Sequence, residues 1–172
     1  MKTFDRMNKF EQNEAICSQA FIELLEKENS NVEPIFPANN YSPYDAYFEF
    51  VNNKGVLKHY FVELKQRNAD YDSFILEQKK LEGMRKQALL DYEVTVDDCV
   101  FLYVNFTPEK TVTWNISNVD NEIKTEEGMF NKATSKNTYD KKVKSVYYLP
   151  VRDGQVSSYV LDREAIVNQL IN

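Results

Sequence analysis

Three side chains, Asp45, Glu63 and Lys65, are of the types needed for metal-assisted chemistry on a phosphate ester. Glu63 and Lys65 lie two residues apart in an apolar run. Side chains in a β-strand alternate between its two faces, so these two point to the same side. Carboxylates are the ligands that hard cations such as Mg²⁺ prefer, and an ammonium group can stabilise charge that develops on a reacting phosphate. The chemistry requires that Asp45 reach the same face.

A short loop predicts how Asp45 reaches that face. The segment Asn53-Lys54-Gly55 has the composition of a three-residue hairpin loop with glycine in the left-handed position. If Asn52 pairs with Val56, the pairing continues along both strands until Asp45 lies directly opposite Glu63. Cross-strand partners share a face and have Cβ atoms roughly 5 Å apart. The sequence therefore predicts two carboxylates and one ammonium group on a single patch.

This arrangement resembles the PD-(D/E)XK nuclease superfamily, which has the restriction-endonuclease-like fold. The residues that carry the resemblance are Asp45, which opens the first strand of the hairpin, and the triplet Glu63-Leu64-Lys65, which ends the second. Apolar residues lead into the triplet, and a long helix is expected after it. The sequence departs from the pattern at Pro43, which stands two residues before Asp45 instead of next to it.

The resemblance implies a metal-dependent nuclease that hydrolyses phosphodiester bonds in DNA. Asp45, Glu63 and the backbone carbonyl of Leu64 would hold Mg²⁺, and we expect Mn²⁺ to substitute for it. Lys65 would hold the attacking water or stabilise charge on the phosphate. By the same resemblance, the enzyme would be an endonuclease of phage, mobile-element or restriction type that leaves 5′-phosphate ends.

Two further polar residues fall on the apolar sides of expected helices. Glu14 lies within the apolar stripe of a helix at about 8–28, and two interpretations of it stay open. It is either a border residue whose carboxylate reaches water or a further acid that binds the metal. Gln78 lies on the apolar side of a helix at about 73–91, where an active-site carboxylate or phosphate would supply hydrogen-bond partners. We assign Gln78 to the catalytic set, orienting Lys65 or the water.

The net charge of −6, from 21 basic and 27 acidic residues, does not favour tight binding of nucleic acid. The distribution of charge matters more than the total, and basic residues gather in two segments. The candidate nucleic-acid-binding residues are Lys79, Lys80, Arg85, Lys86, Lys141 and Lys142. Lys80 is expected on a different face of its helix from Gln78, either in water or facing a phosphate.

The elements that must position these residues predict an α/β (α+β) fold. In order, we expect a helix at 8–28, an edge strand at 32–37, hairpin strands at 45–51 and 56–65, a helix at 73–91 capped by Asp72 or Ser73, and strands at 99–106 and 111–116. This is the αβββαβ order of a restriction-endonuclease-like core, with a central mixed sheet flanked by helices. A polar loop at 118–142, a strand at 144–150 and a closing helix at 161–171 are expected to follow.

Length and composition complete the sequence-based expectations. The 172 residues are 42% hydrophobic and 28% charged, which is ordinary for one globular domain, here 1–172. No apolar run is long enough to span a membrane, and Cys17 and Cys99 lack the spacing of a zinc site, so we expect a cytoplasmic protein. A homodimer stays open. So does a second function: a non-catalytic structural, assembly or binding protein in which Glu63 and Lys65 belong to a surface charge ladder.

Overall fold

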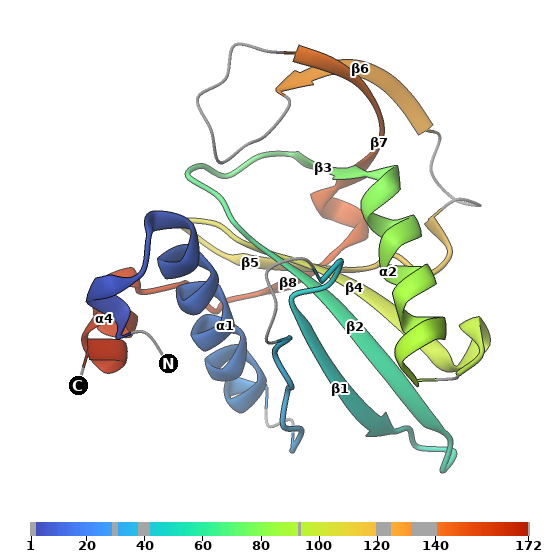
Figure 1. Ribbon diagram of the computed structural model, residues 1–172, viewed down its shortest axis with the longest axis horizontal. Coiled ribbons are helices and arrows are strands. Elements are labelled where there is room, and N and C mark those ends of the chain that lie inside the picture. The colour runs from blue at the N-terminus through green and yellow to red at the C-terminus, as the bar shows by residue number, and fades with distance from the viewer. Residues whose placement is uncertain are drawn as a thin grey trace.

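Two β-sheets and the helices around them form the part of the chain that the computed structural model describes, residues 3–28, 31–37, 42–92, 94–119, 125–131 and 141–171 (Figure 1). The helices are α1 (Lys9–Lys27), α2 (Gln78–Tyr92) and α4 (Arg163–Ile171). The strands are β1 (Ala46–Val51), β2 (Leu57–Gln66), β3 (Ser73–Glu77), β4 (Cys99–Phe106), β5 (Thr111–Asn115), β6 (Thr125–Asn131), β7 (Lys141–Pro150) and β8 (Gln155–Ser157). Short 3₁₀ helices occur at Phe4–Arg6, Val96–Asp98 and Val151–Asp153.

The larger sheet has the strand order β1-β2-β4-β5-β8. Its β2 and β4 are parallel, and the other neighbouring strands pair antiparallel, so the sheet is mixed. The connection from β2 to β4 runs through β3 and α2, as a parallel pair requires a long crossover. The smaller sheet has the order β3-β7-β6 and is entirely antiparallel. It lies beyond the start of α2, at the top of Figure 1.

The β1–β2 hairpin has the register that the loop predicts. Ala46 pairs with Val62 and Val51 with Leu57, while Asn52 donates its backbone N–H to Val56 across the loop at 2.9 Å. Gly55 has φ 75°, the left-handed conformation that glycine adopts without steric cost. The hairpin therefore aligns the residues that precede β1 with those that end β2.

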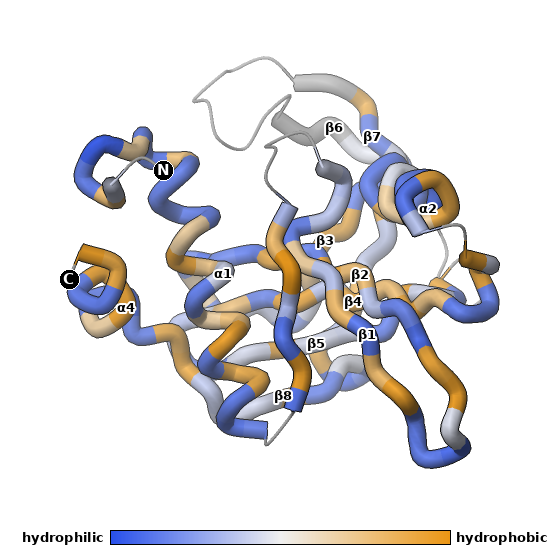
Figure 2. Tube along the Cα trace, turned by 60° about the horizontal axis from the view of Figure 1, so that its bottom comes forward, coloured by the Kyte–Doolittle hydropathy of each residue, from blue (hydrophilic) through white to orange (hydrophobic). Residues whose placement is uncertain are grey.

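The larger sheet is covered by helices on both faces. On one face, Ile16, Ala20 and Phe21 of α1 pack against Val62 and Leu64 of β2. On the other face, Leu81, Met84 and Ala88 of α2 pack in a core with Phe61 and Tyr103. Figure 2 shows the hydrophobic segments of β2 and β4 running between α1 and α2. Alternate residues of β2 therefore belong to different helix-covered faces, and Glu63 and Lys65 belong to the face of α2.

The start of α1 is fixed by its own sequence. The side chain of Asn8 accepts hydrogen bonds from the backbone N–H groups of Phe10 and Glu11, and the Glu11 carboxylate accepts one from the N–H of Asn8. This reciprocal capping box satisfies N–H groups that the first helical turn leaves free. The helix that contains Glu14 therefore begins at Lys9, close to the predicted start at about residue 8.

Three sequence-based assignments were wrong. Residues 73–77 form strand β3 and not the first turns of a helix, because Phe74 and Leu76 are buried while Ser73 and Ile75 are exposed, a period of two. The expected edge strand at 32–37 is reduced to a single bridge between Ile35 and Tyr47. The expected loop at 118–142 contains β6 and the first two residues of β7, and its parts at 120–124 and 132–140 lie outside the described residues.

The predicted fold class is confirmed. The chain is a mixed α/β protein with a central mixed sheet flanked by helices, in the order αβββαβ, followed by further strands and a closing helix. The third strand of that order is β3, after the hairpin, and not the segment before it. The assignment of residues 1–172 to a single domain stays a prediction. None of the helices in the described ranges combines the length and apolar character that a membrane crossing needs.

Candidate active site

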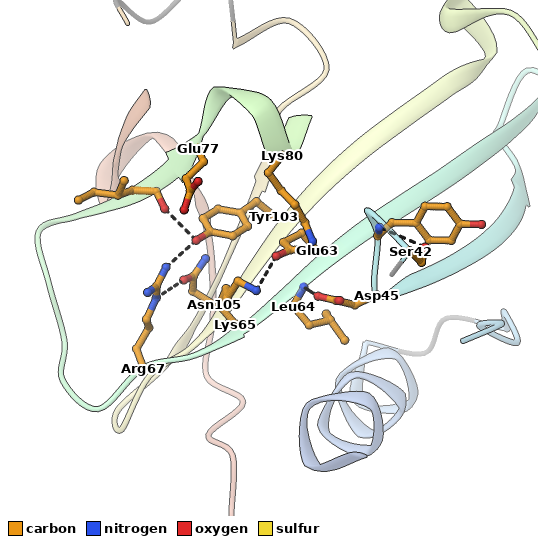
Figure 3. Close-up of polar contacts among 12 residues, drawn as sticks. Ser42, Asp45, Glu63, Leu64, Lys65, Arg67, Glu77, Lys80, Tyr103 and Asn105 are labelled. Carbon is orange, nitrogen blue, oxygen red and sulfur yellow. Dashed lines mark hydrogen bonds and ion pairs between the residues drawn. The ribbon is translucent and has the colours of Figure 1, made fainter. Parts of the chain in front are cut away.

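A buried glutamate held by two lysines forms the centre of the candidate site. The side chain of Glu63 is only 2% exposed. Its Oε1 lies 2.5 Å from Nζ of Lys65 on the same strand, and its Oε2 lies 2.5 Å from Nζ of Lys80 on α2 (Figure 3). The lysines are 44% and 29% exposed, so each ammonium group lies between the buried carboxylate and solvent. Glu63 is therefore buried, and its two lysine partners are the exposed part of the cluster.

The charges of this group determine its protonation. Burial by itself would raise the pKa of Glu63, but the ammonium groups of Lys65 and Lys80 outweigh it and lower that pKa. Burial would lower the pKa of Lys65, but the charges of Glu63 and then Asp45 outweigh it and raise that pKa. At neutral pH Glu63 is therefore ionised and Lys65 protonated, so Lys65 acts as a hydrogen-bond donor and not as a base.

Asp45 lies immediately before β1, opposite Glu63. Its backbone N–H donates to the carbonyl of Val62 at 2.7 Å, which continues the hairpin ladder by one residue. Its Oδ2 accepts a 2.7 Å hydrogen bond from the backbone N–H of Leu64, as Figure 3 shows. Burial, and then the negative charge of Glu63, raise the pKa of Asp45 to about 7, although Lys65 and Lys80 act in the opposite direction. The two carboxylates therefore interact strongly.

Leu64 connects the two acids through its backbone. Within a strand, the N–H and C=O of one residue point to the same neighbouring strand. The Leu64 carbonyl therefore faces the edge of β2 at which its N–H meets Asp45. Two carboxylates and a carbonyl are oxygen donors of the kind that Mg²⁺ and Mn²⁺ select. In the described ranges, no three His, Cys, Asp or Glu side chains are already gathered in metal-binding positions.

Glu14 and Gln78 approach this centre to different degrees. Glu14 is half-buried, and burial raises its pKa; the charges of Glu11 and Glu63 act in the same direction, and those of Lys65 and Lys80 in the opposite one. The Glu14 carboxylate therefore interacts electrostatically with the charged groups of the candidate site. Gln78 is the first residue of α2 and is half-buried. Within the described residues, no hydrogen bond joins its side chain to Glu63 or Lys65, so its catalytic role stays a prediction.

The expected position of Lys80 was wrong. An apolar face that runs from Gln78 includes Leu89, but Leu89 is exposed and Met84 is fully buried. Lys80 lies one turn before Met84, and residues four apart on a helix share a face. The buried stripe is therefore rotated towards Lys80, which brings its ammonium group to Glu63. The signal available in the sequence was the spacing of Lys80, Met84 and Ala88.

A row of polar side chains continues from the candidate site along β4. Tyr103 is the neighbour of Glu63, and Asn105 is the neighbour of Lys65, in the parallel register. Both are buried, and both accept hydrogen bonds from Arg67: Asn105 Oδ1 from Nε at 2.7 Å, and the Tyr103 hydroxyl from Nη2 at 2.5 Å (Figure 3). The Tyr103 hydroxyl in turn donates to the carbonyl of Ile75 at 3.0 Å. No motif in the sequence marks these three residues.

The other candidate nucleic-acid-binding residues occupy varied settings. Lys79 and Lys86 are exposed on α2. Arg85 is half-buried and donates to the backbone carbonyl of Ser117 at 2.7 Å, which links α2 to the end of β5. The backbones of Lys141 and Lys142 begin β7, but their side chains lie outside the described part. The basic surface proposed from the sequence stays a prediction.

The chain shows structural similarity to a known protein but no sequence similarity to a known family. No protein-family model matches the chain, and no curated protein matches it. Among solved structures, the chain is similar to Hjc of Archaeoglobus fulgidus, described as a Holliday junction resolvase from an archaeal hyperthermophile. The TM-score is 0.43 and the identity 10%, over 78% of this chain and 93% of that one. Similarity of this degree does not establish a shared family or activity.

Proposed function

We propose that the protein is a metal-dependent nuclease that hydrolyses phosphodiester bonds in DNA. The observation that supports this most directly is the buried Glu63, held between Lys65 and Lys80 and beside the carboxyl group of Asp45. Groups with strongly shifted pKa values collect at functional sites, where opposite and like charges are brought together for chemistry. The arrangement combines acids that can bind a cation with an ammonium group that can contact a phosphate.

The residues fit a hard divalent cation. Burial is the largest cause of the raised pKa of Asp45 and the negative charge of Glu63 adds to it, and a cation between the two carboxylates would offset that repulsion. Asp45, Glu63 and the Leu64 carbonyl would hold Mg²⁺ or Mn²⁺, and Glu14 would contribute from α1. When bound, the metal would acidify a water molecule and offset negative charge on the phosphate.

The chain's own groups would orient and neutralise the reacting atoms. Lys65, protonated at neutral pH, would donate a hydrogen bond to the attacking water or to an oxygen of the scissile phosphate. Its partner Glu63 fixes the direction of the ammonium group through the 2.5 Å contact. Gln78, at the start of α2, would orient Lys65 or the water. Lys80 pairs with Oε2 of Glu63 and would compete with a metal ion for that carboxylate.

The finer assignment follows from the resemblance stated above. It is a Mg²⁺-dependent endonuclease of phage, mobile-element or restriction type that leaves 5′-phosphate ends and acts on DNA in the cytoplasm. Light scattering of the purified protein would distinguish a monomer from a homodimer.

One observation favours the alternative of a non-catalytic binding protein. Glu63 already has an ammonium group on each oxygen, so the cluster is electrostatically complete without a metal. Under this alternative, the two ion pairs attach α2 to β2. The alternative predicts that neither lysine matters for any chemical reaction.

A panel assay tests the proposal. The purified protein is incubated with labelled duplex, single-stranded and branched DNA and with RNA, each with Mg²⁺, with Mn²⁺ or with EDTA. Metal-dependent cleavage by the wild type, absent from a Lys65→Ala variant of native stability, is expected. Absence of cleavage on every substrate would favour the binding-protein alternative.

A further inference from the structure

A pocket of about 260 Å³ opens beyond the ends of β2 and β4, next to the candidate active site. It is lined by residues 66–68 and 106–108, together with 161 and 163. Its volume is below the roughly 300–1,000 Å³ of pockets for drug-sized ligands, and so suits a small group. In open α/β sheets, ligands bind outside the carboxyl ends of the strands, and this pocket lies at that end of the parallel β2–β4 pair.

Two arginines from distant parts of the chain line the pocket. Arg67 follows β2, and Arg163 begins α4. Both guanidinium groups are held by neutral oxygen acceptors. Arg67 donates to Asn105 and the Tyr103 hydroxyl, and Arg163 donates to Gln66 Oε1 at 2.9 Å and Asn13 Oδ1 at 3.0 Å.

These two arginines differ from Lys65 and Lys80 in their partners. In the described part of the chain, no carboxylate forms an ion pair with Arg67 or Arg163, in contrast to Lys65 and Lys80. The acids near the arginines in the sequence include Glu164, which is exposed, and Asp70 and Asp162, which have other partners. Asp70 accepts from the Thr107 hydroxyl, and Asp162 accepts from the backbone N–H of Ala165 at 3.0 Å. The pocket therefore presents two oriented cations to an incoming ligand.

The direction from the candidate site to the pocket matches a nucleic-acid strand. The backbone N–H of Arg67 donates to the backbone carbonyl of Phe106 at 2.8 Å, so the pairing of β2 with β4 continues past Lys65. Alternate strand residues share a face, which places Arg67 about 6.6 Å beyond Lys65 along the chain. This step is comparable to the spacing of adjacent phosphates in one strand. A phosphate at Lys65 would therefore have its neighbour within reach of Arg67.

We propose that Arg67 and Arg163 form a binding site for a second phosphate of the substrate strand, adjacent to the phosphate that is cleaved. The assignment to nucleic acid rests on the proposed function. Guanidinium groups bind phosphate through paired, charge-assisted hydrogen bonds. The phosphate is either an internal one of a continuous strand or a terminal 5′-phosphate, and the two share the same recognition chemistry.

Binding without hydrolysis tests the site. Fluorescence anisotropy is measured in EDTA with a 3′-labelled single-stranded DNA that carries either a 5′-phosphate or a 5′-hydroxyl. Arg163→Gln and Arg67→Gln should each weaken binding about tenfold, the equivalent of one good charge-assisted contact. They should also reduce the slope of log K against log salt concentration by about 0.7, the value for one phosphate on a single strand.

A matched control removes one positive charge elsewhere. Lys54 is exposed in the hairpin loop, at the opposite end of β2, and among the described residues its side chain has no hydrogen-bond partner. Lys54→Gln should leave both affinity and salt slope close to the wild-type values. Because Arg67 also supports buried groups, Arg163→Gln is the decisive variant, and circular dichroism shows that it is folded.

The outcomes separate the two phosphate sources. A loss confined to the 5′-phosphorylated DNA assigns a terminal phosphate, and an equal loss on both DNAs assigns an internal one. If Arg163→Gln binds like Lys54→Gln, or if the wild type does not bind, the pocket proposal is overturned. If the wild type cleaves DNA and the arginine variants bind it as well as the wild type does, the phosphate-site proposal is wrong and the nuclease proposal stands. If the arginine variants lose binding and the wild type cleaves no substrate, the pocket is a phosphate-binding site of a non-catalytic binding protein.

Discussion

Nζ of Lys80, on helix α2, lies 2.5 Å from Oε2 of Glu63, in strand β2. The contact joins two elements that are separated in the sequence by β3, and it occupies the carboxylate oxygen that Lys65 leaves free. An ammonium group on that oxygen competes with a metal ion for the same negative charge. The relationship between Lys80 and Glu63 therefore links α2 to the state of the candidate metal site.

Replacement of Lys80 should strengthen metal binding. Lys80→Met removes the competing charge while keeping an apolar stem, so Mn²⁺ affinity measured by calorimetry should rise about fivefold, corresponding to roughly 1 kcal/mol for a partly exposed ion pair. Lys79→Met is the control, since Lys79 is exposed on the same helix and the charge change is identical. Equal affinities for the two variants would mean that Lys80 does not compete with the ion.

Loss of Lys65 should separate catalysis from metal binding. Lys65→Ala should reduce the cleavage rate on the order of a hundred- to a thousandfold without weakening Mn²⁺ binding, because lysine contacts water and phosphate and not the ion. Asp45→Ala should lose both cleavage and metal affinity, since it removes an oxygen ligand. Cleavage rates and Mn²⁺ titrations of the two variants are compared. Undiminished cleavage by Lys65→Ala would rule out the mechanism.

The metal-free protein should lose stability as the pH rises through neutrality. Burial and Glu63 raise the pKa of Asp45 to about 7 in the folded protein, against about 3.9 in an unfolded chain. Between these values the unfolded chain has released the proton that the folded protein still binds, so the free energy of unfolding falls with increasing pH. The decrease should amount to roughly 1–2 kcal/mol, because Asp45 keeps some contact with solvent.

Urea unfolding in EDTA at pH 5 and pH 8 measures this decrease. Asp45→Asn should abolish it and should be more stable than the wild type at pH 8. Glu109→Gln makes the same chemical change at an exposed position and should follow the wild type. A wild type that is more stable at pH 8 than at pH 5 would contradict the assignment.

Two glycines should respond oppositely to alanine. A Cβ at Gly154 would lie 2.7 Å from Cγ1 of Val112 and 2.8 Å from the Trp114 ring, closer than real contacts allow. Gly154→Ala should therefore destabilise the protein by about 1–3 kcal/mol, the usual cost of overpacking. At Gly83, inside α2, the nearest atom is the Pro43 Cβ at 3.2 Å, and alanine favours helix by up to about 1 kcal/mol. Thermal denaturation should show Gly83→Ala to be the more stable variant.

The parts of the fold that local chemistry determines could be predicted from the sequence. The loop before Val56 fixes the hairpin register, because Gly55 supplies the left-handed conformation and the two strands pair from there. That register brings Asp45 opposite Glu63, and strand alternation then puts Lys65 on the same face. The helix containing Glu14 is defined by its own capping box. These inferences needed only neighbouring residues.

The parts that depend on tertiary packing could not be predicted. Phe74 fits both the period of a strand and the helical spacing to Gln78 and Leu81, and only pairing with β7 decides for β3. The position of Lys80 beside Glu63 could not be predicted for the same reason, since the buried face of α2 includes Met84 and not Leu89. Arg67 and Arg163 are nearly a hundred residues apart, and their shared pocket exists only in the folded chain.

The local origin of the β1–β2 hairpin has a consequence for the order of folding. Hairpins form in roughly 1–10 μs, whereas Tyr103, the β4 neighbour of Glu63, lies forty residues further along the chain, and such distant pairings form later. Asp45 and Glu63 are therefore expected to meet in the hairpin before β2 pairs with β4. We expect Mn²⁺ to accelerate refolding in stopped-flow experiments and to lose that effect in Asp45→Asn. The cation-binding groups would then contribute to the earliest barrier that the chain crosses, as well as to the chemistry of the finished protein.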